Sequence, residues 1–363
     1  MRIADVSIFR CDFQLRNPSI VAYEALDVAQ NVIVRIELEN GLIGWGSAAP
    51  DQHVTGETAK TVEDTIRAQF VPFLLGSDAS RIEFIWSMLG EIAPDHPSAL
   101  AAIDIALYDL LGKRAQMPLH KLLGCARNEI ETSITLSIED IETSISRAME
   151  FQSQGFKALK IKCGLNAEED VERVKAIRQA VSNLTRITLD ANQGYTVEET
   201  LKVLEALRDC DIAFIEQPVA ADDSEALTEV CRRSPMPVMA DESILSAADV
   251  LTTPAPLVNL KLMKTGGITG ALKANAVAEA RGIRAMLGCM DESRISMAAA
   301  AHLVLSQSNF AYADLDGHLD IIGDVVNGGI LIENGLVSVG DVEGLGISKN
   351  GSHIFHLAES HSA

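Results

Sequence analysis

The feature that most constrains the fold of this 363-residue chain is an alternation of short apolar runs and amphipathic segments between residues 156 and 264. Each apolar run has the length of a buried strand, and each amphipathic segment has the pattern of a helix. Strands that alternate with helices at this spacing are typical of a parallel sheet. The five runs occupy residues 156–162, 186–192, 213–218, 237–243 and 257–264.

Three more strands fit the same period, and they are predicted to begin near residues 131, 283 and 310. Eight strands that recur at this interval, with helices between them, meet the requirement of a TIM-like (β/α)8 barrel. We therefore predict an α/β fold in which such a barrel occupies residues 126–318.

The part of the chain before the barrel predicts an α+β capping domain over residues 1–125. Two strands surround Asn40-Gly41, a pair that strongly favours a hairpin. Helical patterns fill residues 57–93 and 97–115. Residues 16–30 show no clear period, so we expect a long loop there.

The last part of the chain, residues 319–363, returns to a strand-like pattern with a hairpin signal at Asn334-Gly335. This segment is expected to rejoin the cap. Asp104 stands among apolar residues in the predicted helix of the cap, and we expect it to be buried and hydrogen-bonded in a structural role.

Composition narrows the classes of partner. The net charge of −21 argues against nucleic-acid and acidic-membrane partners, although solubility alone accounts for much of such a charge. The six cysteines form no Cys-x-x-Cys pair, which argues against a zinc site or a disulfide framework. There is no signal-peptide pattern and no apolar run long enough to span a membrane. We expect a cytoplasmic protein.

Polar residues capable of chemistry stand near the C-terminal ends of the predicted strands. In a closed parallel barrel, side chains at these ends meet at one mouth. One such residue alone would ordinarily be the first polar residue of a loop, but six on successive strands argue against coincidence. We expect convergence of Lys160, Lys162, Asp190, Glu216, Asp241 and Lys264.

Three carboxylates held together would repel one another unless a cation lay between them. Carboxylate oxygens favour Mg²⁺, with Mn²⁺ as the second choice, over zinc. Lysines on either side of such a metal suit proton transfer at a carbon next to a carboxylate, because the metal takes up charge as an enediolate forms. The positive charge of Lys160 would favour the neutral, basic form of Lys162.

Several motifs together resemble the enolase superfamily, in its muconate-lactonizing-enzyme-like subgroup, along essentially the whole chain. The resemblance implies that Asp190, Glu216 and Asp241 bind Mg²⁺ and that Lys162 faces Lys264 across the substrate. It also implies a homo-oligomer. The matching segments are 101–113, 160–162, 190–192, 216–218, 241–243 and 261–267.

The predicted eighth strand narrows the function within this family. Asp314-Leu315-Asp316 resembles the pair with which dipeptide epimerases hold the free ammonium of a dipeptide, and the segment 289–293 fits the same group. Two carboxylates two residues apart lie on one face of a strand. Without the resemblance, the pair would read as an ordinary acidic loop. The implied reaction is a 1,1-proton transfer at the α-carbon of the second residue, which converts an L,L-dipeptide into an L,D-dipeptide.

Other functions remain open. Muconate cycloisomerases, o-succinylbenzoate synthases and N-acylamino-acid racemases share the implied fold, but their substrates lack a free ammonium, so Asp314 and Asp316 argue against them. A class I aldolase would use a Schiff-base lysine and would need no set of three carboxylates. A non-catalytic binding protein would need neither the lysines nor the carboxylates.

Acidic residues near the expected mouth predict which dipeptide is preferred. Glu24 stands where relatives that accept an acidic second residue offer an arginine, and Asp291 stands where an apolar residue is common. Asp51 follows the second strand of the cap hairpin. Acidic groups attract cationic side chains and repel acidic ones. We therefore predict a preference for dipeptides that contain Lys or Arg, unless Glu24 and Asp51 are merely solvated loop charges.

Overall fold

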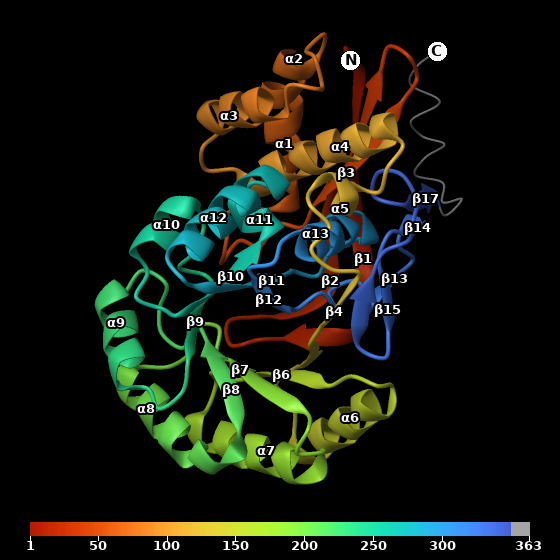
Figure 1. Ribbon diagram of the computed structural model, residues 1–363. Coiled ribbons are helices and arrows are strands. Elements are labelled where there is room, and N and C mark those ends of the chain that lie inside the picture. Colours follow the sequence, from red (N-terminus) through yellow and green to blue (C-terminus); the bar gives the residue numbers. More distant parts are fainter. Residues whose placement is uncertain (350–363) are drawn as a thin grey trace.

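The computed structural model describes residues 1–349, and its centre is an eight-stranded parallel sheet (Figure 1). A parallel bridge between Thr132 and Ala313 joins the two ends of the sheet and closes the predicted barrel. The strands are β5 (Ile134–Leu136), β6 (Ala158–Lys162), β7 (Arg186–Asp190), β8 (Ile212–Glu216), β9 (Val238–Ala240), β10 (Leu257–Lys261), β11 (Arg284–Gly288) and β12 (Phe310–Ala313).

Helices connect these strands and cover the outside of the barrel (Figure 1). Local sequence sets where they begin: Asn166 caps α7, and Thr196 and Glu199 form a capping box at the start of α8. The helices are α6 (Ile141–Ser153), α7 (Ala167–Ala180), α8 (Val197–Ala206), a 3-10 turn (Arg208–Cys210), α9 (Ser224–Arg233), α10 (Ala247–Thr252), α11 (Leu262–Thr265), α12 (Ile268–Ala280) and α13 (Arg294–Ser306).

The predicted barrel type is confirmed with one difference, since no helix follows β12 among residues 314–349. The chain instead forms short strands: β13 (Ile321–Ile322) pairs with the first strand of the cap, and β16 (Leu336–Ser338) pairs with β4 (Glu129–Glu131). The expected hairpin at Asn334-Gly335 joins β15 (Leu331–Glu333) to β16, and β14 (Val326–Gly328) pairs with β17 (Ile347–Lys349). The domain boundaries stay predictions, and residues 350–363 of the predicted last segment lie outside the described residues.

The cap combines an antiparallel sheet with helices. Helix α4 packs against β3 at very short range, because Gly44 and Gly46 carry no side chain: an added Cβ would lie 2.3 Å from Ala106 O or 1.9 Å from Ala102 O. The elements are β1 (Ile3–Ile20), β2 (Ala25–Leu38), β3 (Ile43–Ala48), α1 (Ala59–Thr65), a π-helical turn (Ile66–Phe70), α2 (Val71–Leu74), α3 (Ile82–Ile92), α4 (Pro97–Ala115) and α5 (Leu119–Leu122).

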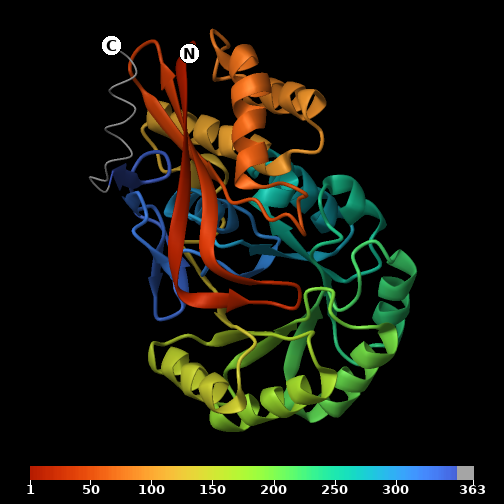
Figure 2. The ribbon, with the colours of Figure 1, turned by 180° about the vertical axis from the view of Figure 1, so that it is seen from behind.

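The prediction of a long loop at residues 16–30 is wrong. Strand β1 continues to Ile20 and β2 begins at Ala25, so the two strands form one long ribbon that turns where Val21 N donates to Glu24 O at 3.0 Å. The pairing of the two strands is interrupted between Gln14 and Ser19. The side of the ribbon that faces the barrel carries Asn17 and Ser19 as well as Leu26 and Val28, so no sustained apolar alternation marks the ribbon in the sequence. Figure 2 shows this ribbon, in red, reaching from the cap to the barrel.

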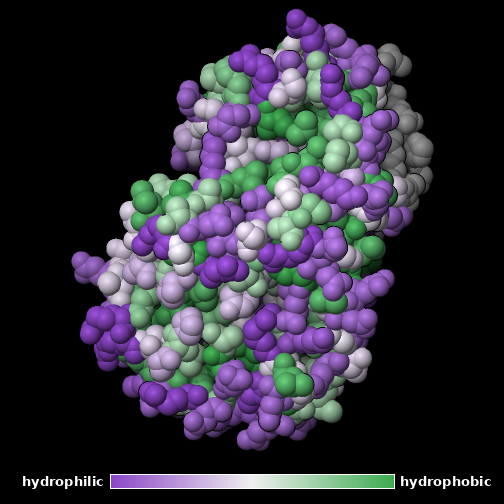
Figure 3. Space-filling view, viewed as in Figure 1, coloured by the Kyte–Doolittle hydropathy of each residue, from purple (hydrophilic) through white to green (hydrophobic). Residues whose placement is uncertain are grey.

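Asp104 joins the cap to the barrel, as its predicted structural role requires. It lies in α4, is 1% exposed and accepts hydrogen bonds from the backbone N (3.0 Å) and hydroxyl (2.7 Å) of Thr269 at the start of α12. On the face seen in Figure 3, hydrophilic and hydrophobic residues are interspersed, with hydrophobic ones gathered between cap and barrel. Within residues 1–349, none of the helices has both the length and the apolar character needed to cross a membrane.

Candidate active site

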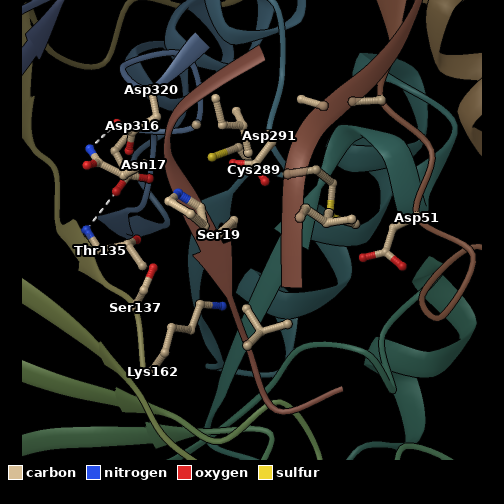
Figure 4. A pocket seen from close by; sticks show the side chains of 18 of the residues that line it. Asn17, Ser19, Asp51, Thr135, Ser137, Lys162, Cys289, Asp291, Asp316 and Asp320 are labelled. Atoms are coloured by element: carbon tan, nitrogen blue, oxygen red, sulfur yellow. Dashed lines mark hydrogen bonds between the residues drawn. The ribbon is translucent and has the colours of Figure 1, made fainter. Parts of the chain in front are cut away.

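A cavity of about 750 Å³ lies between the tip of the ribbon and the C-terminal end of the barrel. Lysines from two strands and acidic residues from several segments of the cap and the barrel line it. Most of the predicted site residues line this cavity, and Figure 4 shows several of them. They are Glu24, Asp51, Lys160, Lys162, Asp291, Asp314 and Asp316.

The three predicted metal ligands lie beneath this cavity. Strand register pairs Asp190 at the end of β7 with Lys162 on one side and with Glu216 at the end of β8 on the other. Asp241 is the first residue after β9, the next strand. All three carboxylates are fully buried, so the fold brings them together as expected.

Lys160 neutralises much of this charge. Its ammonium lies 2.9 Å from Asp190 Oδ2, 3.0 Å from Glu216 Oε2 and 2.8 Å from Asp314 Oδ2. Burial alone would lower the pKa of Lys160, but attraction to Asp190, Asp314 and Glu216 outweighs it, so its pKa lies well above the usual value. Lys160 is therefore a fixed cation.

The predicted position of Lys264 is wrong. The strand expected to run to residue 264 ends at Lys261, and Lys264 lies in the short helix α11, 1% exposed and outside the cavity lining. Its Nζ donates to the Asp241 carboxylate and to the backbone oxygens of Asp241 (2.5 Å) and Asn259 (3.1 Å). A short helical turn can bury its residues as a strand does, so the apolar run did not mark where the strand ends.

Lys261 occupies the place expected of Lys264. It ends β10, lines the cavity, and places its Nζ 2.8 Å from Asp241 Oδ2. Burial lowers and the charge of Asp241 raises the pKa of Lys261, and the charge prevails. Sequence reasoning missed this residue, although Asn259 and Lys261 alternate with apolar neighbours as Lys160 and Lys162 do.

Comparison with known proteins identifies the family. Residues 3–124 match the mandelate racemase / muconate lactonizing enzyme N-terminal domain, and residues 144–352 match the enolase C-terminal domain-like model. This chain belongs to that family of the enolase superfamily, as the sequence motifs predicted.

Similar members of the family are epimerases. The hydrophobic dipeptide epimerase of Enterococcus faecalis is 40% identical over 96% of this chain and 100% of its own length. Its structure, complexed with Mg and L-Leu-L-Tyr, matches with a TM-score of 0.93. The L-Lys-D/L-Arg epimerase of Desulforapulum autotrophicum is 38% identical over 96% and 100% of the two chains. The substrate-liganded L-Ala-D/L-Glu epimerase of Bacillus subtilis is 36% identical over 96% and 99%, with a TM-score of 0.93.

The donor set beneath the cavity fits a hard divalent cation. Among residues 1–349, no hydrogen-bond donor reaches Glu216 Oε2 or Asp241 Oδ2, and these two oxygens form ion pairs with Lys160 and Lys261. Burial, and next the charge of Asp190, raises the pKa of Glu216 well above its usual value. Lysine ammonium groups lie between these carboxylates. Within residues 1–349, no group of three His, Cys, Asp or Glu side chains has the spacing of a preformed metal site. Three buried carboxylates on neighbouring strand ends remain the oxygen donors that Mg²⁺ favours.

The eighth strand contributes two further carboxylates to the cavity. Asp314 accepts from the hydroxyl of Ser133 at 2.7 Å as well as from Lys160, and Asp316 accepts from the backbone N of Thr135 at 2.7 Å (Figure 4). Burial and the neighbouring charge of Asp314 raise the pKa of Asp316 to about 7. A cation placed beside Asp316 would favour its ionised form and so lower this pKa.

Three acidic residues approach the same cavity from the cap and from the seventh strand end. Asp51 accepts from the hydroxyl of Tyr23 at 3.0 Å, and Figure 4 shows it on a different side of the cavity from Asp316. Burial and the charge of Asp51 raise the pKa of Glu24, and burial raises that of Asp291 to about 6. The raised pKa values of Glu24 and Asp291 indicate that these two carboxylates are partly removed from water.

Proposed function

We propose that this chain is a Mg²⁺-dependent dipeptide epimerase. The observation that carries the proposal is the placement of Lys162 and Lys261 around one cavity above three buried carboxylates. Strands β6 and β10 are four positions apart in the eight-stranded barrel, which puts the two lysines on opposite sides of its mouth. Two proton-transfer groups on opposite sides of one carbon are what inversion by 1,1-proton transfer needs.

Asp190, Glu216 and Asp241 would hold Mg²⁺, with Mn²⁺ as a proposed substitute. When bound, the cation would take up the negative charge that develops on the carboxylate of the substrate. One lysine, in its neutral form, removes the α-proton of the second residue, and the other, as an ammonium, delivers a proton to the opposite face. Which of Lys162 and Lys261 plays which part depends on the epimer that binds.

The remaining residues of the site support these steps. Lys160 stays protonated and adds fixed positive charge beside the reacting carboxylate. Lys264 holds the Asp241 carboxylate in place from below, which is a positioning role in place of the acid/base role predicted for it. Asp314 and Asp316 would bind the free ammonium of the dipeptide, and this contact distinguishes the proposal from N-acylamino-acid racemisation.

We also propose a preference for dipeptides that contain Lys or Arg. The named relatives act on hydrophobic, cationic and acidic dipeptides, so family membership leaves the side chains open. Glu24, Asp51 and Asp291 line the cavity and supply three acidic groups around the space left for substrate side chains. Acidic groups that line a pocket favour cationic partners and disfavour acidic ones. The cytoplasmic location and the homo-oligomer stay predictions.

A dipeptide library tests the function directly. Mg²⁺-loaded protein is incubated with free dipeptides in D₂O, and each product is examined for the mass shift of one α-deuterium. We expect incorporation into free dipeptides, most rapidly into those with Lys or Arg. No incorporation into any dipeptide would refute the proposal, and faster turnover of N-acylamino acids would favour a racemase of the same fold.

A further inference from the structure

Two neighbours of different chemistry hold the ammonium group of Lys162. Its Nζ lies 2.8 Å from Asp190 Oδ2 and 3.0 Å from the amide oxygen of Asn192. Asp190 is a proposed metal ligand, so a bound cation would compete with Lys162 for that carboxylate. Asn192 lines the cavity and is 4% exposed. Because Asn192 is not a proposed metal ligand, a bound cation would leave its contact with Lys162 in place.

The amide of Asn192 can face Lys162 in only one orientation. Its backbone has a φ of 41°, a left-handed conformation that Asn tolerates, and its backbone N donates to Asp190 Oδ1 at 3.0 Å. Its Nδ2 donates to Glu242 Oε1 at 3.0 Å. When Glu242 is ionised it has no hydrogen to donate, so the NH₂ end of the amide faces Glu242 and the oxygen faces Lys162, as observed.

Asn192 follows β7, and Glu242 reaches it from the loop after β9, two strands away in the barrel and 50 residues further along the chain. It is 5% exposed, and its other oxygen, Oε2, has no hydrogen-bond partner within the described part of the chain. A buried carboxylate that makes one side-chain hydrogen bond, to the amide beside the reacting lysine, is placed to orient that amide.

We propose that Asn192 and Glu242 are positioning residues for Lys162: Glu242 fixes the orientation of the Asn192 amide, and the amide oxygen holds the lysine nitrogen in place for proton transfer. This role rests on the proposed function. If the amide turned round, its N–H groups would point at the ammonium and repel it. A misplacement of about 1 Å in a catalytic group can cost about 10²-fold in rate.

The hydrogen bond from Asn192 reaches only one of the two acid/base lysines, although the charge of Glu242 also acts on Lys261. In the part of the chain that the structure describes, Lys261 Nζ contacts Asp241 Oδ2 at 2.8 Å and Met290 Sδ at 3.9 Å, and no amide. Because the two lysines act on opposite faces of the α-carbon, losing the Asn192–Glu242 contact should slow proton removal from one epimer. A defect in folding or in metal binding would slow both.

The test measures the loss of α-deuterium to water from each epimer of a dipeptide that the wild-type protein turns over. Lys162→Ala first identifies the epimer that Lys162 deprotonates, because washout from that epimer is lost. Asn192→Gly keeps the left-handed backbone, and Glu242→Gln keeps the shape of the side chain but lets the amide turn. Both should slow washout from the same epimer by about 10- to 100-fold, and from the other by less than about threefold. Thermal unfolding and Mg²⁺ affinity, measured by calorimetry, should stay near wild type.

Gln193→Gly is the matched control. Gln193 is also left-handed, with a φ of 70°, but its side chain accepts from Ala221 N at 2.8 Å and does not contact Lys162. Its replacement should leave both washout rates near wild type. Equal slowing of the two epimers by Asn192→Gly and Glu242→Gln, or no slowing, would overturn this role while the wild-type protein still exchanges both. A wild-type protein that exchanges neither would overturn the proposed function and this role together.

Discussion

Replacing Lys261 and Lys264 one at a time separates chemistry from structure at this site. Lys261 reaches the cavity, so Lys261→Ala removes a proton-transfer group. Proton transfer by a positioned side chain contributes about 10²–10⁴-fold, which corresponds to about 3–6 kcal/mol of barrier at about 1.4 kcal/mol per tenfold. We expect kcat for epimerisation to fall by about 10³-fold or more. Lys162 should still exchange the α-proton of one epimer.

Lys264→Met should act through structure. Met fills similar space but cannot donate to the Asp241 carboxylate or to the two backbone oxygens that Lys264 Nζ contacts. Removing one partner of a buried ion pair typically costs about 3–5 kcal/mol. Lys261 remains as a counter-ion at 2.8 Å, so the loss should lie toward the lower end. The expected signs are a lower melting temperature and weaker Mg²⁺ binding.

Three measurements decide between the two lysines: epimerisation by chiral chromatography, α-proton exchange for each epimer, and calorimetric Mg²⁺ affinity. Lys261→Ala should keep its Mg²⁺ affinity closer to wild type than Lys264→Met does. Near-normal epimerisation by Lys261→Ala would refute its assignment as an acid/base. A folded, metal-binding Lys264→Met that exchanges one epimer but cannot invert it would restore the assignment first made from the sequence.

Four further expectations follow from the same contacts. Chelation should abolish activity, with Mg²⁺ or Mn²⁺ restoring it; full activity after thorough metal removal would contradict the carboxylate site. Acetylating the dipeptide amine should lower kcat/KM by several orders of magnitude, since an unpaired buried charge costs about 3–5 kcal/mol, and Asp316→Asn should reduce the discrimination between free and acetylated dipeptides. Glu24→Arg should shift kcat/KM from Lys- or Arg-containing dipeptides toward Ala-Glu; better turnover of Ala-Glu by the unmodified enzyme would exclude the charge argument. Because the folded pKa of Asp316, about 7, lies above that of the unfolded chain, Asp316 binds more protons when folded. The free energy of unfolding should therefore fall as pH rises from about 4 to 7, and this part of the pH dependence should be absent in Asp316→Asn. Melting temperatures measured across that range would show both.

The sequence predicted the barrel because a regular alternation of buried strands and amphipathic helices leaves few other folds open. The predicted strand starts near 186, 213, 237, 257 and 283 each lie within one residue of the strands observed. The predictions failed where apolar residues do not recur at a regular interval along the sequence. The side of the ribbon tip that faces the cavity mixes polar and apolar residues, and the turn of α11 continues an apolar run. Neither the ribbon nor the end of β10 could therefore be located from the apolar pattern alone.

The site residues that the sequence predicted correctly are those placed by the strands themselves. Asp190 and Glu216 end their strands and Asp241 directly follows one, so topology alone brings them together. The Asn192–Glu242 contact joins two loops whose residues are 50 positions apart, and no spacing rule in the sequence predicts which loop side chains will meet. Orientation of the lysines is therefore decided by tertiary contacts that strand patterns do not encode.

Charge balance explains why one mouth would bind both a divalent cation and an ammonium. The carboxylates near the ends of β7, β8, β9 and β12 number six, namely Asp190, Glu216, Asp241, Glu242, Asp314 and Asp316, and the lysines of β6, β10 and α11 number four, namely Lys160, Lys162, Lys261 and Lys264. Burial raises the pKa values of Glu216, Glu242 and Asp316, and the neighbouring carboxylates raise them further, as expected where negative charge is in surplus. A divalent cation beside Asp190, Glu216 and Asp241 would balance it. A free dipeptide brings one charge of each sign: its carboxylate would lie beside the divalent cation, and its ammonium would pair with the negative charge of Asp314 and Asp316. Substrates without that ammonium would leave the charge unpaired in a buried site, which is the physical reason to expect free dipeptides over acylated amino acids.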